Sequence, residues 1–367
     1  MPAKMLLLAI GLVLAVPQEV VGPVKGLEPS SQLQLLPYKT VGRYAQRNDG
    51  GVVRQWPGTY FEANFLGSEV YFRIGAGDMD LRLSLDRAVP QALERASPGL
   101  YRIAGLVRSR HHIRIDIASE TKAAPTVFGG FFAAPETRAL PTVRRARAIE
   151  FIGDTHTVGY ANLSNAKQCS DETVRRTTDT SQGIAALTAA RFDADYQVNA
   201  ISGRGVVRNY NGAAADTVPT LYPFSLFDKS ARTADPSWHP QVLAISLGTN
   251  DFSTPLHAGE EWTSRVELRG AFQMRYVGFV RDLRLLYPKA YIVLWATDIG
   301  DGETSREVAN VAQLVNAGGV HQVGLVIVSG LRFSACNSHP GLEDDRKIAD
   351  ALAEHLIRNV RGWQRPG

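Results

Sequence analysis

Cysteine is scarce in this 367-residue sequence, which contains only Cys169 and Cys336. No CxxC pair occurs, and at most one disulfide can form. Because the two cysteines are far apart in sequence, such a bond would close a long loop and stabilise the fold by roughly 3–5 kcal/mol on the chain-entropy model. The alternative is two buried thiols that never meet. The residues alone leave both states open.

The motifs of several common enzyme classes are also absent. The sequence has no GxxxxGK[ST], HExxH or GxSxG. The segments GAGDMD and SGRGVV contain GxG without a third glycine, so the dinucleotide-binding fingerprint is missing. His111 and His112 lie in one predicted strand without a third ligand. We therefore expect neither a metal nor an organic cofactor.

The sequence also lacks a large excess of either positive or negative charge. The net charge is +4, and 21% of the residues are charged. The basic clusters, of which Val143–Glu150 is the densest, lack the interleaved aromatic residues of an RNA-binding surface. This composition argues against a nucleic-acid partner. The 44% of apolar residues is enough for folded cores, and the length suggests two domains.

The long apolar run that a membrane span needs is missing too. The run Met5–Val16 follows Lys4 and has the length of a signal-peptide core, which is too short to cross a bilayer. We expect a signal peptide over residues 1–22, a linker over 23–37, a secreted or periplasmic protein and no membrane partner. No clear small-x-small cleavage site is evident, so the sequence does not define the cleavage point. A buried strand or a frayed apolar start is the alternative.

Residues 38–135 have the pattern of an all-β domain. Apolar and polar residues alternate in Thr59–Phe65, Glu69–Ala76, Asp80–Asp86 and His111–Ser119. Glycine, aspartate, asparagine and proline separate these stretches, as expected of turns. Short strands at this spacing predict a β-sandwich. The segment 136–147 then interrupts the pattern with prolines and arginines, and we expect it to be a linker.

Residues 148–363 have an α/β pattern. Predicted strands alternate with predicted helices, which favours a parallel sheet covered on both faces. The strands are Ala148–Gly153, Tyr196–Ser202, Gln241–Gly248, Ala290–Thr297 and Val323–Gly330, and the helices are Ser181–Ala194, Ala271–Pro288 and Gly341–Val360. In such sheets the functional site lies beyond the carboxyl ends of the strands.

Reactive or polarising groups follow four of these segments. The first strand is followed by Asp154 and Thr155, the second by Gly203, the third by Asn250, and the last by His339. A hydroxyl nucleophile needs a base within hydrogen-bond reach, and its tetrahedral intermediate needs N–H donors. Thr155 has the hydroxyl, His339 can be the base, and Gly203 and Asn250 can donate.

The blocks GDT, SGRG, GTND and SHP, in this order, resemble those of the SGNH hydrolases, or GDSL esterases. The segments WPGTYFEANFLG, IEFIGDTHTVGYAN, FDADYQVNAISGRGVVRNYNG and LGTNDFS are similar to carbohydrate esterase family 2. That family joins a jelly-roll domain to a three-layer α/β/α SGNH domain, and its members remove O-acetyl groups from xylan and glucomannan. The resemblance implies an acetylated polysaccharide or oligosaccharide substrate; we expect a monomer.

The same resemblance implies the role of each site residue. Thr155 stands where the family has its nucleophilic serine, Gly203 and Asn250 are oxyanion donors, and His339 is the general base. Asn337 stands near the position of the usual aspartate and is a candidate for orienting His339. A Cys169–Cys336 disulfide would tie the base loop to the nucleophile loop, and we predict it.

Four further residues are candidates for substrate binding, namely Asp154, Arg204, Trp238 and Trp295. A structural role is the alternative for each of them. For the whole chain, the alternative to an acetyl esterase is a carbohydrate-binding protein whose catalysis is impaired by Thr155. A third hypothesis is an esterase for lipid-like esters, because the SGNH fold hosts these too.

Overall fold

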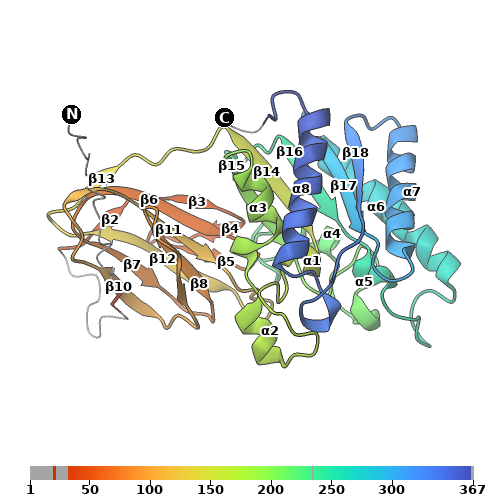
Figure 1. The fold of residues 1–367 in the computed structure, drawn as a ribbon, viewed down its shortest axis with the longest axis horizontal. Coiled ribbons are helices and arrows are strands. Elements are labelled where there is room, and N and C mark those ends of the chain that lie inside the picture. Colours follow the sequence, from red (N-terminus) through yellow and green to blue (C-terminus); the bar gives the residue numbers. More distant parts are fainter. Residues whose placement is uncertain (1–19, 22–31, 234, 365–367) are drawn as a thin grey trace, which may run out of the picture.

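The computed structural model describes residues 20–21, 32–233 and 235–364. It consists of an N-terminal β-sandwich beside an α/β domain (Figure 1). Both predicted architectures are confirmed. None of the helices in the described ranges is long and apolar enough to cross a membrane. Most of the predicted signal peptide, residues 1–19, lies outside the described residues.

The sandwich is built from two antiparallel sheets. One sheet has the order β1-β10-β7-β12-β5-β4, with β2 also paired to β12, and the other has the order β13-β6-β11-β8-β9, with β3 paired to β6. The strands are β1 (Val20–Val21), β2 (Gln34–Leu36), β3 (Lys39–Val41), β4 (Tyr44–Gln46), β5 (Val52–Arg54), β6 (Tyr60–Gly67), β7 (Val70–Ile74), β8 (Leu81–Leu85), β9 (Gln91–Leu93), β10 (Gly99–Ile103), β11 (Ser109–Ile117), β12 (Thr126–Ala133) and β13 (Arg138–Leu140). Alternate side chains such as Phe61, Phe72 and Phe128 fill the space between the sheets.

Three short strands lie in stretches that were expected to be signal peptide or linker. β1 lies inside the stretch predicted as signal peptide and pairs with β10. β2 lies inside the predicted linker 23–37 and pairs with β12, and β13 lies inside the predicted linker 136–147 and pairs with β6. Each of these strands is only two or three residues long, which is too short for an alternation of apolar and polar residues to be seen in the sequence. Pairing with a longer strand stabilises each of them.

The α/β domain has one parallel five-stranded sheet with the order β15-β14-β16-β17-β18. Its strands are β14 (Arg147–Gly153), β15 (Ala194–Ala200), β16 (Val242–Ser246), β17 (Tyr291–Thr297) and β18 (Val323–Val328). Its helices are α1 (Thr155–Val158), α2 (Asp171–Thr177), α3 (Ile184–Ala190), α4 (Val218–Leu221), α5 (Thr249–Phe252), α6 (Arg265–Leu286), α7 (Glu303–Ala317) and α8 (Leu342–Asn359), with short 3-10 turns at η1 (Thr180–Gln182), η2 (Tyr210–Gly212) and η3 (Cys336–Ser338).

Helices cover both faces of this sheet (Figure 1). α3 and α8 pack together against Phe151, Val198 and Val293 on one face, and α6 and α7 pack against Ile152 and Ile245 on the other. The helix predicted over 181–194 is shorter, because η1 and Gly183 precede α3. Residues 194–200 extend as β15 instead.

Buried ion pairs join the two domains. Glu62 of β6 lies 2.6 Å from Lys39 and 2.9 Å from Arg114. Asp195 of β15 accepts from Lys39 at 2.9 Å and from Arg145 at 2.7 Å. Burial raises the pKa of Glu62, but Arg114, Arg145 and Lys39 outweigh it and lower that pKa to about 2. The carboxylate therefore stays ionised, and charged pairs cross the junction between the sandwich and the parallel sheet.

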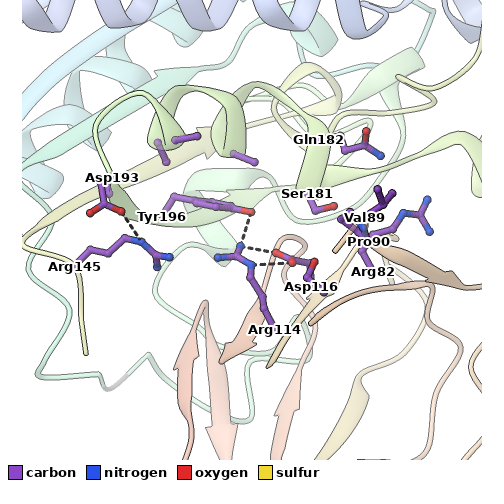
Figure 2. A pocket seen from close by; sticks show the side chains of 15 residues that line it. Arg82, Val89, Pro90, Arg114, Asp116, Arg145, Ser181, Gln182, Asp193 and Tyr196 are labelled. Atoms are coloured by element: carbon purple, nitrogen blue, oxygen red, sulfur yellow. Dashed lines mark hydrogen bonds and ion pairs between the residues drawn. The ribbon is translucent and has the colours of Figure 1, made fainter. Parts of the chain in front are cut away.

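A cavity of about 580 Å³ opens at this junction (Figure 2). Figure 2 shows Arg114 reaching from β11 to the hydroxyl of Tyr196, 3.3 Å away, and Arg145 pairing with Asp193 at 3.1 Å. These arginines thus have protein partners already. The cavity is part of the interface between the domains rather than a site with an unpaired cation.

Candidate functional site

The candidate nucleophile lies at the first residue of α1. β14 ends at Gly153, and the Asp154 side chain caps α1 by accepting from the amide N–H of His156 at 3.3 Å. A Cβ on Gly153 would lie 2.0 Å from Oγ1 of Thr157, so this tight strand-to-helix turn requires glycine. The turn places Thr155 at the carboxyl edge of the sheet.

The Thr155 hydroxyl faces the loop that follows β15. This loop contains Gly203 and Gly205 and is called the glycine loop below. The amide nitrogen of Gly203 lies 3.4 Å from Thr155 Oγ1. Gly203 has a φ of 82°, in the left-handed region that favours glycine. In the part of the chain that the structure describes, no hydrogen bond joins Thr155 Oγ1 to the imidazole of His339. The hydroxyl therefore accepts from the N–H of Gly203, the candidate oxyanion donor.

Asn250 links the nucleophile turn to the glycine loop. Its Nδ2 donates to the Arg204 carbonyl at 2.9 Å and to the Asp154 carboxylate at 3.2 Å. Both amide hydrogens are thus used within the protein. Donation to a substrate oxyanion requires one of these two bonds to give way.

Asp251 stabilises the glycine loop by accepting hydrogen bonds from its backbone. Its carboxylate accepts from the amide N–H groups of Val206, Val207 and Arg208, each at 2.9 Å. A Cβ on Gly205 would lie 2.4 Å from the Asp251 carboxylate and closer still to a backbone carbonyl. Burial raises the pKa of Asp251 to about 6, although these N–H bonds oppose the shift. Asp251 therefore holds the loop that carries Gly203 through backbone N–H groups.

The candidate base is His339, just after η3. Its Nδ1 lies 2.9 Å from the carbonyl oxygen of Cys336 and donates to it, which leaves Nε2 as the free acceptor. The ring of Tyr160 packs 4.5 Å from the imidazole, centroid to centroid. This hydrogen bond and this contact fix the tautomer and the orientation of His339.

The suggestion that the Asn337 side chain orients His339 is wrong. Nδ2 of Asn337 donates to the hydroxyl of Tyr160 at 3.0 Å. Asn337 has a φ of 55°, so the turn points its side chain outward. The backbone carbonyl of Cys336 performs the orienting role instead, and a neutral carbonyl stabilises imidazolium less than a carboxylate does.

Burial sets the pKa of this base. It lowers the pKa of His339 below the usual 6.5, while the carbonyls of Cys336 and Asn337 partly raise it again. His156 is buried beside it, and burial followed by the charge of His339 lowers the pKa of His156 to about 3. Both imidazoles are therefore neutral at pH 7, and His339 is the one with a fixed donor bond.

We expect the kcat/KM of ester hydrolysis to fall on its acidic side with an apparent pKa below 6.5. As pH drops through the lowered pKa of His339, Nε2 binds a proton and can no longer accept one from the nucleophile. A pH profile with 4-nitrophenyl acetate measures this limb. A limb near pH 7 would contradict it and indicate Asp154, whose pKa burial raises to about 7.

Cys169 and Cys336 form a disulfide. Cys169 follows the nucleophile helix, and Cys336 carries the carbonyl that holds His339. The bond also spans 167 residues of chain. It therefore constrains the base loop directly as well as the unfolded state.

Replacing both cysteines by serine is expected to lower the free energy of unfolding by roughly 3–5 kcal/mol. It should also lower kcat, because the Cys336 carbonyl loses its anchor. Urea unfolding and acetate release measure the two effects. Dithiothreitol should act similarly on the intact chain and leave the double serine variant unchanged. An unaltered unfolding midpoint in the variant would contradict this expectation.

Three of the four predicted substrate-binding residues lie away from any accessible surface of the site. Trp295 is fully buried in the sheet core. Trp238 is 6% exposed, and its Nε1 donates to Glu150 at 2.9 Å. Asp154 is fully buried and binds Asn250 and His156 instead. Arg204 is the exception, since it is half-buried in the glycine loop.

Two tyrosines beside the site were missed in the sequence. Tyr160 packs on His339. Tyr210 is 54% exposed, and its amide N–H donates to the Gly203 carbonyl at 2.9 Å. The position of Tyr210 seven residues after Gly203, in the same loop, was the available signal.

Comparisons with known proteins give a consistent result. Residues 40–142 match the family model described as carbohydrate esterase 2 N-terminal. The chain is 37% identical over 309 residues to an acetylxylan esterase / glucomannan deacetylase of Cellvibrio japonicus, covering 84% of this chain and 86% of that protein.

Solved structures agree with this relationship. One is a carbohydrate esterase whose active site displays divergent catalytic and non-catalytic binding functions. It has a TM-score of 0.85 and 35% identity, covering 90% of this chain and 100% of that chain. A family two carbohydrate esterase from Clostridium thermocellum, in complex with cellohexaose, has a TM-score of 0.77 and 25% identity, covering 89% and 100%.

Proposed function

This chain belongs to carbohydrate esterase family 2, and from that premise we propose that it removes O-acetyl groups from plant-type polysaccharides such as xylan and glucomannan. The observation that carries the proposal is the juxtaposition of the Thr155 hydroxyl, at a strand-to-helix turn, with the amide N–H of Gly203 at 3.4 Å. A nucleophile beside an oxyanion donor is what acyl transfer needs.

We propose the following reaction for these residues. Nε2 of His339 takes the proton of the Thr155 hydroxyl, and Oγ1 attacks the acetyl carbonyl carbon. The carbonyl oxygen becomes an oxyanion that accepts from the Gly203 N–H. His339 then gives its proton to the sugar oxygen as the ester bond breaks. Water, deprotonated by the same imidazole, releases acetate and restores Thr155.

The exposed ring of Tyr210 supports a sugar as the alcohol part of the ester. It lies on the loop that carries Gly203, where its accessible face can pack on the apolar face of a pyranose. Arg204, between these two residues, supplies a half-buried cation that can contact hydroxyl groups. We include Arg204 and Tyr210 as the substrate-binding residues of this proposal.

Export from the cytoplasm is part of the proposal. The Cys169–Cys336 disulfide suits an oxidising compartment, and a polysaccharide substrate lies outside the cell. The apolar run Met5–Val16 is the expected signal for that route. The protein would act there as a monomer without a metal or organic cofactor.

A second candidate function is sugar binding without turnover. The observation that favours it is the Thr155 hydroxyl, which is turned toward Gly203 and makes no hydrogen bond to His339 among the described residues. Such a protein would hold the polysaccharide in a cleft whose nucleophile is misdirected. Isothermal calorimetry with xylo-oligosaccharides, run beside the turnover assay, separates binding from hydrolysis.

The test is the release of acetate from acetylated xylan and glucomannan, compared with 4-nitrophenyl acetate and 4-nitrophenyl octanoate. We expect release from the polysaccharides and faster turnover of the acetyl ester. A preference for the octanoyl ester would contradict the proposal and support a lipid esterase. Sugar binding with no acetate release would support the second candidate.

A further inference from the structure

We propose that the β-sandwich completes the catalytic site, with Glu120 as a positioning residue that holds the Gly203 oxyanion donor in place. The inference rests on the proposed function, in which Gly203 donates to the oxyanion. It assigns the N-terminal domain a part in catalysis that is separate from any sugar binding of its own.

Glu120 lies in the turn between β11 and β12 of the sandwich and reaches across to the α/β domain. Its Oε1 accepts from the amide N–H of Ser202 at 2.7 Å. Its side chain is only 10% exposed. A carboxylate that accepts from a backbone N–H in a largely buried place makes a charge-assisted bond, which is about twice as strong as a neutral one.

Ser202 is the residue directly before the oxyanion donor. The N–H of Gly203 belongs to the same planar peptide as the carbonyl of Ser202, and only φ and ψ of Ser202 separate that peptide from the N–H that Glu120 holds. Fixing the N–H of Ser202 therefore limits the directions that the Gly203 N–H can take. The Ser202 hydroxyl is buried and has no hydrogen-bond partner among the described residues. Backbone contacts therefore hold this residue in place, and Glu120 supplies the one to its N–H.

Lys122 contacts the carbonyl group of Ser202, whereas Glu120 contacts its N–H. Its Nζ lies 3.5 Å from the Ser202 carbonyl oxygen and 3.9 Å from the Glu120 carboxylate. A cation at this carbonyl polarises the peptide whose N–H belongs to Gly203, which strengthens that N–H as a donor. The Lys122 side chain is half exposed, so solvent weakens its electrostatic effect on the Ser202 carbonyl. Its contribution to holding the oxyanion donor is therefore smaller than that of Glu120.

The turn that carries Glu120 is itself anchored. The Gln55 side chain donates to the carbonyl of Lys122 at 3.1 Å and accepts from the amide of Phe227 at 2.9 Å. Thr121 donates to the Gln55 carbonyl at 3.3 Å. The turn is therefore held by the sandwich on one side and by the α/β domain on the other.

The same connection between β11 and β12 also contacts the nucleophile side of the site. The carbonyl of Ala118 accepts from the amide N–H of Thr180 at 3.1 Å. The hydroxyl of Thr180 donates to the carbonyl of Val158, the last residue of α1, at 2.8 Å. One loop of the sandwich thus touches the glycine loop directly and the nucleophile helix through one residue.

The test compares Glu120→Ala, Glu120→Gln and Glu136→Ala in the full chain, each with Thr155 and with Thr155→Ser. Glu136 is a matched control because it is a carboxylate of the same sandwich with an 84% exposed side chain. We expect Glu120→Ala to lower kcat for 4-nitrophenyl acetate roughly 10- to 100-fold with little change in KM, because the oxyanion forms only in the transition state. Glu120→Gln should recover most of the rate, since its amide oxygen accepts the same bond.

Two results would overturn the proposal. One is an unchanged kcat in Glu120→Ala. The other is a loss of kcat that is equal in Glu120→Ala and Glu120→Gln, or that is accompanied by a matching fall in the thermal unfolding midpoint. Either pattern indicates a merely structural role for Glu120. His339→Ala distinguishes this failure from that of the proposed function. If His339→Ala keeps full turnover, the site assignment is wrong and the proposal falls with it.

Discussion

The Thr155→Ser variant is expected to release acetate roughly 100-fold faster than the chain with Thr155, a change of about 2.7 kcal/mol in the barrier. Serine keeps the attacking hydroxyl and removes the methyl group. The methyl restricts χ1 of threonine and makes the hydroxyl a secondary, more hindered alcohol. Small misplacements of a nucleophile have effects of this size.

The local geometry supports this expectation. Thr155 is 5% exposed at the first residue of α1, so its side chain has little room. Its hydroxyl accepts from the Gly203 N–H, the donor that the proposed mechanism assigns to the substrate oxyanion. Attack requires Nε2 of His339 to take the proton of this hydroxyl, although no hydrogen bond joins the two groups among the described residues. A serine side chain has no methyl group to accommodate in this buried place when its hydroxyl rotates about χ1.

Two controls make the comparison specific. Thr155→Ala removes the hydroxyl and should show no turnover above background. Thr157→Ser makes the same chemical change two residues later in α1, at a buried hydroxyl without a partner among the described residues, and should leave the rate unchanged. Equal rates for the chain with Thr155 and its Thr155→Ser variant would show that the methyl does not hinder attack. Turnover by the serine form alone would favour the sugar-binding function for the chain with Thr155.

Much of the site could be predicted because a parallel sheet gathers the residues that follow its strands. Thr155, Gly203 and Asn250 follow β14, β15 and β16, which are adjacent strands of the sheet. The sheet therefore brings these three residues together although they are far apart in sequence. The burial of Trp238 against Glu150 could not be predicted in this way, because burial depends on contacts between distant segments.

The errors have separate physical causes. Trp238 and Trp295 lie near strand ends in sequence, yet a large aromatic ring is as suited to a core as to a sugar platform. Asn337 stands close to His339 in sequence, but a left-handed φ directs its side chain to Tyr160. The α7 helix was not predicted, although Val308, Val311, Ala312 and Val315 in it have helical spacing and are buried.

Contacts between the domains were the least predictable part. Glu120 lies 82 residues before Ser202, in a turn whose sequence is that of an ordinary surface loop. Nothing in local pattern distinguishes it from Glu136, which is exposed on the same sandwich. Only the packing of the two domains brings its carboxylate to the glycine loop.

His339→Ala is expected to lower acetate release roughly 10²- to 10⁴-fold, the usual contribution of a positioned general acid–base group. The measurement is best made in the Thr155→Ser background, where the higher starting rate leaves room to see the loss. His321→Ala is the matched control and should keep full activity, because His321 is exposed just before β18, at the opposite end of that strand from the carboxyl edge of the sheet.

His156 is the neighbouring imidazole, with its ring centroid 5.9 Å from that of His339. It is the other imidazole close to Thr155 in the fold, and its own properties exclude it as the base. Burial lowers the pKa of His156 to about 3, and such a group accepts a proton poorly at pH 7. His339 instead has an Nδ1–H bond to the Cys336 carbonyl, which directs its Nε2 as an acceptor. A large loss in His339→Ala, with KM little changed, therefore assigns the proton transfer to His339.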